Sequence, residues 1–256
     1  MHKIKAFTVR NTKEILRDPL SYLFCIGFPL VMLVIMTLVD RSIPKEAGMT
    51  IFRIRNLSGG IMVFGLTFVM LFTAITVAKD RSSAFLLRMY ASPMTAVDFI
   101  VGYLLPMLLI ALLQCGLIGL GSYLLSLLVG EPLSIAGLLL SLPAAIPAAV
   151  FFSGLGLLFG TILSEKAAPG LCSIIISLGS FLGSIWFDAE ATGGVLLDIA
   201  RCLPFHYCTK AVRSAIQLNW TADSFGFPLL IVCLSAALIL GAAALVFRLK
   251  MKAELA

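Results

Sequence analysis

Six long apolar runs that contain no Asp, Glu, Lys, Arg or His constrain the fold of this chain more than any other feature. A helix crosses the hydrocarbon core of a bilayer with about 20 residues, and each run reaches that length. Lipid offers the backbone no hydrogen-bond partner, so each run must be helical. The sequence predicts an all-α integral membrane protein with six transmembrane helices, at residues 20–39, 57–78, 99–129, 133–163, 167–187 and 225–247.

The composition leaves little material for a domain in water. Hydrophobic residues make up 60% of the 256 residues and charged residues only 12%, whereas soluble domains carry about 25% charged residues. We therefore expect one membrane domain over residues 1–256. The formal net charge is +6, but the basic residues lie at the ends of the apolar runs. This placement favours contact with membrane lipid and predicts no nucleic-acid partner.

The distribution of basic residues predicts the orientation. Of the 19 Lys and Arg residues, 12 fall on the side of the predicted spans that carries both chain ends, and 7 fall on the other side. Cytoplasmic segments are enriched in Lys and Arg. We therefore expect a multi-pass protein of a cell membrane, the bacterial plasma membrane in the simplest case, with both termini in the cytoplasm.

Residues 1–19 predict an amphipathic helix on the cytoplasmic membrane surface, called here the interfacial helix. Its apolar arc carries Ile4, Phe7 and Ile15, although Asn11 interrupts that arc. Such a helix lies in the plane of the interface; the alternative is an unstructured basic leader. One neighbouring arc, at about 100° per residue, carries the basic side chains Lys3, Arg10, Lys13 and Arg17.

Residues 188–224, between the last two predicted spans, contain two apolar patches that are too short to cross a membrane. The patches are Val195–Ala200 and Ala211–Ile216, and Pro204 lies between them. They predict short re-entrant helices that enter the membrane part way from outside, with Pro204 near the start of the second helix. The alternative is an ordinary surface loop. Cys202 and Cys208 lie in this segment, either as free thiols or as a pair.

The spans lack the residues that other membrane functions need. Carriers coupled to protons or sodium usually place an ionisable group inside the membrane, and these runs contain none. The chain has only two His residues and no HExxH or GxxxxGK[ST] motif, so it predicts no metal site, no catalytic site and no ATP hydrolysis of its own. We expect no enzyme and no cofactor in this chain.

A stripe of small residues in the fifth predicted span indicates close helix packing. Small side chains let two helices approach closely. The contact lies either within one subunit or with a second subunit. The residues of this stripe are Ser173, Ser177, Gly179, Ser180, Gly183 and Ser184.

The segment between the second and third spans carries the most specific pattern. Asp80–Arg81 is followed by Phe85–Leu86, Arg88 and Ser92–Pro93. This pattern resembles the permease family of type-2 ABC exporters, in which the second span ends in an acidic residue and Arg before a short coupling helix. The segments 10–19 and 203–213 resemble the interfacial helix and the short external helices of the same family.

The resemblance implies a coupling loop at residues 79–93 that docks into a groove on a separate ATPase subunit. Phe85 and Leu86 would supply the apolar contact, with charged residues at the rim; the alternative is that these charges only anchor helix ends among lipid headgroups. The residues expected to couple the chain to the ATPase are Lys79, Asp80, Arg81, Phe85, Leu86 and Arg88.

The resemblance also implies the assembly and the activity. Two such permeases, the same chain or a paralogue, would pair with two ATPase subunits, which would hold the ATP and Mg. The drug- and antibiotic-exporting members lack a large outer domain, as this chain does, so we expect export of a small amphipathic or hydrophobic compound. The alternatives are export of a lipid-linked polysaccharide and, in another class, a membrane anchor or assembly factor without transport.

Overall fold

A computed structural model describes residues 2–44, 49–83, 85 and 94–255, and within these ranges the chain is helical without a β-strand, which confirms the all-α prediction. The helices follow one another as α1 (His2–Leu16), α2 (Pro19–Tyr22), η1 (Leu23–Gly27), α3 (Phe28–Ser42), α4 (Ile54–Ser82), α6 (Ala96–Val129), α7 (Ile135–Ile162), α8 (Ala168–Leu182), α9 (Ala189–Thr192), α10 (Gly194–Cys202), α11 (Pro204–Ile216), η3 (Ala222–Gly226) and α12 (Phe227–Leu255).

Five helical stretches of the described chain are long and apolar enough to cross a membrane. They correspond to five of the six predicted spans. The remaining predicted span, the fifth in chain order at residues 167–187, forms only the 15-residue helix α8. At 1.5 Å per residue this helix is about 22 Å long, which is shorter than a hydrocarbon core of about 30 Å. The five stretches are Pro19–Ser42, Ile54–Ser82, Ala96–Val129, Ile135–Ile162 and Ala222–Lys250.

Helix α8 is shorter than its apolar run because the chain turns out of the helix at Ser184. This residue has a left-handed φ of 55°. The amide of Ser184 donates to the carbonyl of Phe181, and that of Ile185 donates to the carbonyl of Ser180. This pair of bonds is the Schellman ending of a helix, which usually has glycine at the left-handed position. Here Gly183 comes one residue earlier.

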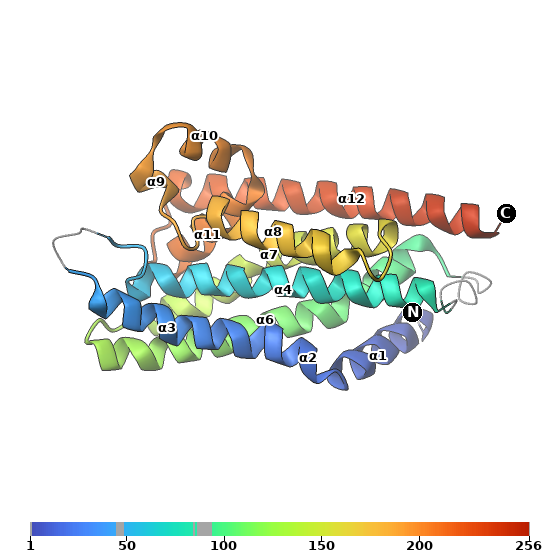
Figure 1. Ribbon diagram of the computed structural model, residues 1–256, viewed down its shortest axis with the longest axis horizontal. Coiled ribbons are helices and arrows are strands. Elements are labelled where there is room, and N and C mark those ends of the chain that lie inside the picture. Colours follow the sequence, from blue (N-terminus) through green and yellow to red (C-terminus); the bar gives the residue numbers. More distant parts are fainter. Residues whose placement is uncertain (1, 45–48, 84, 86–93, 256) are drawn as a thin grey trace.

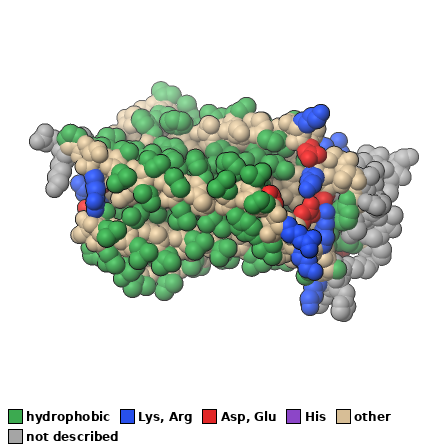
Figure 2. All heavy atoms as spheres, turned by 60° about the horizontal axis from the view of Figure 1, so that its bottom comes forward, with side chains coloured by type: hydrophobic (Ala, Val, Ile, Leu, Met, Phe, Trp, Pro, Cys, Tyr) green, Lys and Arg blue, Asp and Glu red, His purple; other side chains and the backbone are tan. Residues whose placement is uncertain are grey.

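The helices pack around α4, whose side chains are buried along most of its length. Helices α3, α6, α7, α8 and α11 all contact it, as Figure 1 shows. The outer faces remain apolar: Leu109 on α6 and Leu238 on α12 are 60% and 74% exposed. Figure 2 shows a broad hydrophobic surface between charged groups at the two ends. This surface matches a bilayer, and the protein is a multi-pass membrane protein.

The two ends of the bundle differ in their contents. Both chain termini lie at one end, together with α1 (Figure 1); we call it the terminal end. The opposite end, called the far end, carries α9, α10 and α11. There Arg213 Nε donates to the carbonyl of Asn56 at 2.8 Å, which fixes α11 against the start of α4. Short helices are present on both sides of the chain at Pro204, which is the first residue of α11.

Close contact between α4 and α7 depends on glycine. A Cβ added to Gly160 would lie 2.6 Å from the carbonyl oxygen of Ala74 and 2.7 Å from the Cβ of Val77. A Cβ added to Gly156, one turn earlier, would lie 2.4 Å from the carbonyl oxygen of Met70. Small residues at such crossings let the backbones meet and give extensive van der Waals contact, the main source of helix association in lipid.

Gly160→Ala is therefore expected to destabilise the protein. Alanine favours a helix by about 1 kcal/mol over glycine, but overpacking at this crossing costs about 1–3 kcal/mol. Gly116→Ala is the matched control, because a Cβ there meets nothing within 4 Å. Thermal unfolding in detergent should show a lower midpoint for Gly160→Ala only. Equal midpoints for the two variants would contradict the role of this crossing.

Candidate functional site

A buried carboxylate, Asp80, connects three helices at the terminal end. Arg10 of α1 donates from Nη1 to Asp80 Oδ2 at 2.5 Å and from Nη2 to Oδ1 at 2.7 Å. Tyr103 of α6 donates its hydroxyl proton to Oδ2 at 2.7 Å. The Asp80 side chain is only 3% exposed and that of Arg10 is 34% exposed. Such a forked, charge-assisted pair fixes the geometry as well as the charge.

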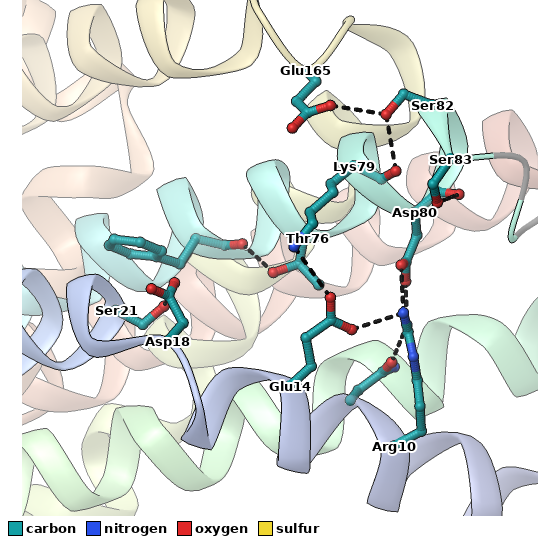
Figure 3. Close-up of polar contacts among 12 residues, drawn as sticks. Arg10, Glu14, Asp18, Ser21, Thr76, Lys79, Asp80, Ser82, Ser83 and Glu165 are labelled. Atoms are coloured by element: carbon teal, nitrogen blue, oxygen red, sulfur yellow. Dashed lines mark hydrogen bonds and ion pairs between the residues drawn. The ribbon is translucent and has the colours of Figure 1, made fainter.

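Two carboxylates, those of Asp80 and Glu14, stabilise the charged form of Arg10. Partial burial disfavours the charged form, but the hydrogen bond and negative charge of Asp80, followed by the charge of Glu14, outweigh it and raise the pKa of Arg10 above its ordinary value. Glu14, one turn later on α1, lies 2.7 Å from Arg10 and also pairs with Lys79 of α4 at 3.5 Å. Figure 3 shows this chain of charges between α1 and α4.

Aromatic rings pack on the other side of Arg10. The ring of Phe7 meets those of Phe99 and Tyr103 edge-on, with centroids 5.5 and 5.0 Å apart, and stacks with Phe85 at 6.4 Å. The guanidinium carbon of Arg10 lies 4.1 Å from the centroid of the Phe85 ring, a cation–π geometry. Phe85, the first apolar residue of the predicted coupling contact, therefore packs on α1.

Asn11 explains the interruption of the apolar arc of the interfacial helix. Its side chain is 1% exposed, and Nδ2 donates to the carbonyl of Gly102 at 3.0 Å. That carbonyl lacks its usual helical partner because Pro106, four residues on, has no N–H. Gly102 also leaves room for Phe7, whose ring a Cβ would strike. The apolar arc of α1 thus packs against protein, where we had expected contact with lipid.

Arg81 ties the end of α4 to the end of α7. Its guanidinium donates to the carbonyl of Thr161 and, at 2.7 Å, to that of Leu163. The last carbonyls of a helix have no partner within the helix, so Arg81 caps α7. Ser82 Oγ donates to Glu165 at 2.9 Å. The connection between α7 and α8 is thereby attached to the start of the predicted coupling loop.

These contacts correct the expected placement of the charged pair. We expected Asp80 and Arg81 at a solvated rim facing the ATPase; instead, Asp80 is buried against Arg10, and Arg81 caps α7. A helix end offers free carbonyls, and a buried carboxylate needs a partner, so both groups are satisfied within the chain. Lys79 is exposed. Leu86 and Arg88 lie outside the described residues.

The basic arc of the interfacial helix separates into two kinds of residue. Arg10 is fixed in the buried pair, whereas Lys13 and Arg17 are exposed; the side chains of these two make no ion pair or hydrogen bond with a described residue. The side chain of Lys3 lies outside the described part of the structure. A cavity of about 770 Å³ lies between α1 and α4, beside Lys13 and Arg17.

The predicted stripe of small residues divides between two environments. Gly179 and Gly183 approach Phe205 of α11, and Ser184 Oγ lies 3.2 Å from His206 Nδ1, so this half packs within the chain. Ser180 is buried as well. The other two residues are exposed on α8, and their hydroxyls bond to carbonyls of their own helix; they are Ser173 and Ser177.

A second polar cluster, missed from the sequence, lies at the far end around His206. Its Nε2 lies 3.6 Å from Glu190, which Lys210 also holds at 2.7 Å. Burial is the main cause that lowers the pKa of His206; Glu190 opposes it, and the charges of Lys210, Arg201 and Arg213 add to it. Cys202 and Cys208 are free thiols, and Cys208 is fully buried. The one sequence feature that pointed to this cluster was His206, which follows the apolar residues Leu203–Pro204–Phe205.

The far end is expected to weaken in mild acid. Since folding lowers the pKa of His206 below its ordinary 6.5, its contribution to stability is complete above about pH 6.5 and is lost as the pH falls toward the folded pKa. The pKa of Glu190 is lowered too, because Lys210 outweighs burial; its contribution is lost only below about pH 4.5. The midpoint temperature of thermal unfolding should decrease as the pH falls from about 7 to about 5.5, and this decrease should be smaller in His206→Gln. Equal slopes would contradict this assignment.

Comparison with known families agrees with the architecture. Residues 2–217 match the family described as ABC-2 type transporter. This match includes α1, the Asp80 network, the predicted coupling loop and the far-end helices up to α11. A search among curated proteins gave no match. The matched region covers well over half of the 256 residues, and the chain therefore belongs to the ABC-2 type transporter family.

Proposed function

We propose that this chain is the membrane-spanning permease subunit of an ATP-driven exporter and that separate ATPase subunits supply the energy. The observation that carries the proposal is the position of the predicted coupling loop. It leaves α4 beside Asp80, the carboxylate that joins α1, α4 and α6. A force applied to this loop would act directly on three helices. Membership of the ABC-2 family supports the partnership with an ABC ATPase.

Six membrane crossings fit the path of the chain. Helix α7 ends at the terminal end, where Arg81 binds its last carbonyls. Helix α11 lies at the far end, where Arg213 binds Asn56. Residues 163–203 must therefore pass from one end to the other, and α8 is the apolar helix between these points. We propose that α8 and its flanking residues form the fifth crossing, with both termini in the cytoplasm.

The orientation can be tested with reporter fusions. Fusions at Ala256 and near Glu131 are expected to report opposite sides of the membrane, with Ala256 in the cytoplasm. The reason is the uneven count of Lys and Arg, which favours the terminal end as the cytoplasmic side. Reports from the same side for both fusions would refute the six-crossing topology.

Transmission of the ATPase stroke would use the contacts of the terminal end. We propose that residues 79–93 dock on the ATPase and that the Asp80 network carries displacement to α1 and α6. Arg81 would carry it to α7. Packed and hydrogen-bonded groups carry coupling between sites, and these contacts form one such connected set among the described residues.

A dimer follows from the proposed mechanism. Two closing ATPase subunits offer two grooves, and one permease supplies one coupling loop. Ser173 and Ser177 leave a narrow, exposed part of α8 where a second permease could approach closely. The substrate that we propose is a small amphipathic or hydrophobic compound, because the six apolar runs contain no charged residue with which to bind a charged one.

Reconstitution with the partner ATPase tests the function. The expected result is a complex with two permeases and two ATPase subunits that moves an amphipathic dye only when ATP is present. Persistence of transport without ATP, together with its collapse on addition of an uncoupler, would refute the proposal. A complex that binds the ATPase but is stimulated only by a lipid-linked polysaccharide would redirect it to that substrate. The absence of any associated ATPase would favour a membrane anchor.

A further inference from the structure

The cavity between α1 and α4 at the terminal end has a polar and an apolar part. Its volume of about 770 Å³ falls within the range of roughly 300–1,000 Å³ that is usual for small-molecule sites. Arg10, Lys13, Arg17 and Lys79 contribute positive charge to its lining, and Glu14 and Asp18 contribute negative charge. The lining therefore has an excess of two positive charges, one of which, that of Arg10, is paired with Asp80 outside the lining.

The acidic side chains of this lining are already engaged. Glu14 pairs with Arg10 and Lys79. Asp18 caps the start of α2: its Oδ1 accepts from the amide of Leu20 at 3.1 Å and its Oδ2 accepts from Ser21 Oγ at 2.7 Å. Glu14 is therefore paired with cations, whereas Asp18, whose donors are neutral, makes no ion pair with a described residue.

Two cations of the lining remain available. Lys13 and Arg17 lie four residues apart on α1, so they share one face of the helix. Neither side chain makes an ion pair or hydrogen bond with a described residue, and both line the cavity. The cavity therefore presents two cationic side chains that form no ion pair within the described chain.

The apolar part of the cavity lies deeper in the bundle. Ile75 and Phe72 of α4 line it together with Lys79. At 1.5 Å per residue, Ile75 lies about 6 Å and Phe72 about 10 Å from Lys79 along the helix axis. The lining thus changes from cationic to hydrophobic over the distance at which a phospholipid changes from headgroup to acyl chain.

We propose that this cavity binds an anionic phospholipid of the leaflet at the terminal end. Lys13 and Arg17 hold the phosphate, and one acyl chain lies along Ile75 and Phe72. A soluble phosphate compound shares the charge but has no use for the apolar wall, so the lipid fits the whole lining. The site requires that the protein lie in a membrane, but it does not require that the protein transport anything.

The test uses the full-length protein in nanodiscs of phosphatidylcholine with added phosphatidylglycerol. Bound lipid is counted by native mass spectrometry after gentle release. We expect one phosphatidylglycerol to be retained preferentially over phosphatidylcholine. Lys13→Gln/Arg17→Gln should lower its retention by about tenfold or more, because each cation near the bilayer surface contributes about 1 kcal/mol. Lys5→Gln/Lys250→Gln is the control, since it removes two exposed charges that do not line the cavity.

A second variant tests the apolar half. Val9 lines the cavity and is 43% exposed, so Val9→Trp should fold while filling part of the space. We expect it to lower phosphatidylglycerol retention with all charges intact. Wild-type retention in both the charge variant and Val9→Trp would overturn the proposal. Displacement of the lipid by millimolar inorganic phosphate would overturn the assignment to lipid in favour of a soluble phosphate.

Discussion

Arg10→Ala is expected to lower the free energy of unfolding by about 3 kcal/mol, a large effect for a residue on a peripheral helix. The substitution leaves the Asp80 carboxylate buried, and among the described residues only the Tyr103 hydroxyl then remains as its partner. Removing one member of a buried ion pair costs about 3–5 kcal/mol. Since the Arg10 side chain is 34% exposed, water screens part of the interaction and the lower end of that range applies.

A double-mutant cycle separates this pair from the packing of α1. Arg10→Ala/Asp80→Ala should be less destabilised than the sum of the single variants by about 2 kcal/mol, because neither charge is then left buried alone. Lys5→Ala is the control, since this exposed residue lies on the same helix. Unfolding in mixed micelles measures all four variants. Additive single effects would show that Arg10 and Asp80 do not stabilise each other.

The spans were predictable because lipid imposes a simple pattern on the sequence. A run without charges, about 20 residues long, has no soluble alternative, and five runs form helices of the expected position. The length of α8 was not predictable from hydrophobicity. The apolar run continues to Phe187, but Ser184 adopts a left-handed backbone that ends the helix. Only local backbone hydrogen bonds distinguish these two outcomes.

The candidate site was predictable in its residues but not in its contacts. The pattern of Asp80 and Arg81 identified the segment, yet no spacing in the sequence indicates that Asp80 meets a residue 70 positions earlier. Burial decides this pairing, because an unpaired carboxylate cannot remain in the bundle. The sequence offered a smaller clue in Asn11, a polar residue on an apolar arc.

Proline provides the physical reason for that clue and for a second one. Pro106 leaves the carbonyl of Gly102 without an N–H partner, and Asn11 supplies one. At the far end, Pro228 likewise frees the carbonyl of Ser224, which accepts from Ser214 Oγ at 2.7 Å. In both cases a carbonyl freed by a proline accepts a hydrogen bond from a polar side chain of another helix. The sequence shows the proline and the polar residue, but not that they pair.

Phe85→Asp is expected to abolish most of the coupling between ATPase and transport. In the structure the ring stacks on Phe7 and lies under the guanidinium of Arg10. An aromatic pair and a cation–π contact contribute about 2 kcal/mol together. Their loss therefore lowers the population in which residue 85 packs on α1 by about 10- to 30-fold. The new carboxylate would also compete with Asp80 for Arg10. Phe85→Leu, which keeps an apolar side chain, is the matched control.

The site of action decides what a pull-down of the ATPase shows. If Phe85 acts through α1, as its contacts indicate, Phe85→Asp retains the ATPase but no longer stimulates hydrolysis or transports, and Phe7→Ala has the same effect. If the ring instead contacts the ATPase, Phe85→Asp loses the ATPase in the pull-down and Phe7→Ala does not. We expect the first result, because the only ring and cation contacts of Phe85 among the described residues are with α1. Wild-type coupled hydrolysis in Phe85→Asp would refute a role for residues 79–93 in transmission, since a charge at this position must disturb either contact.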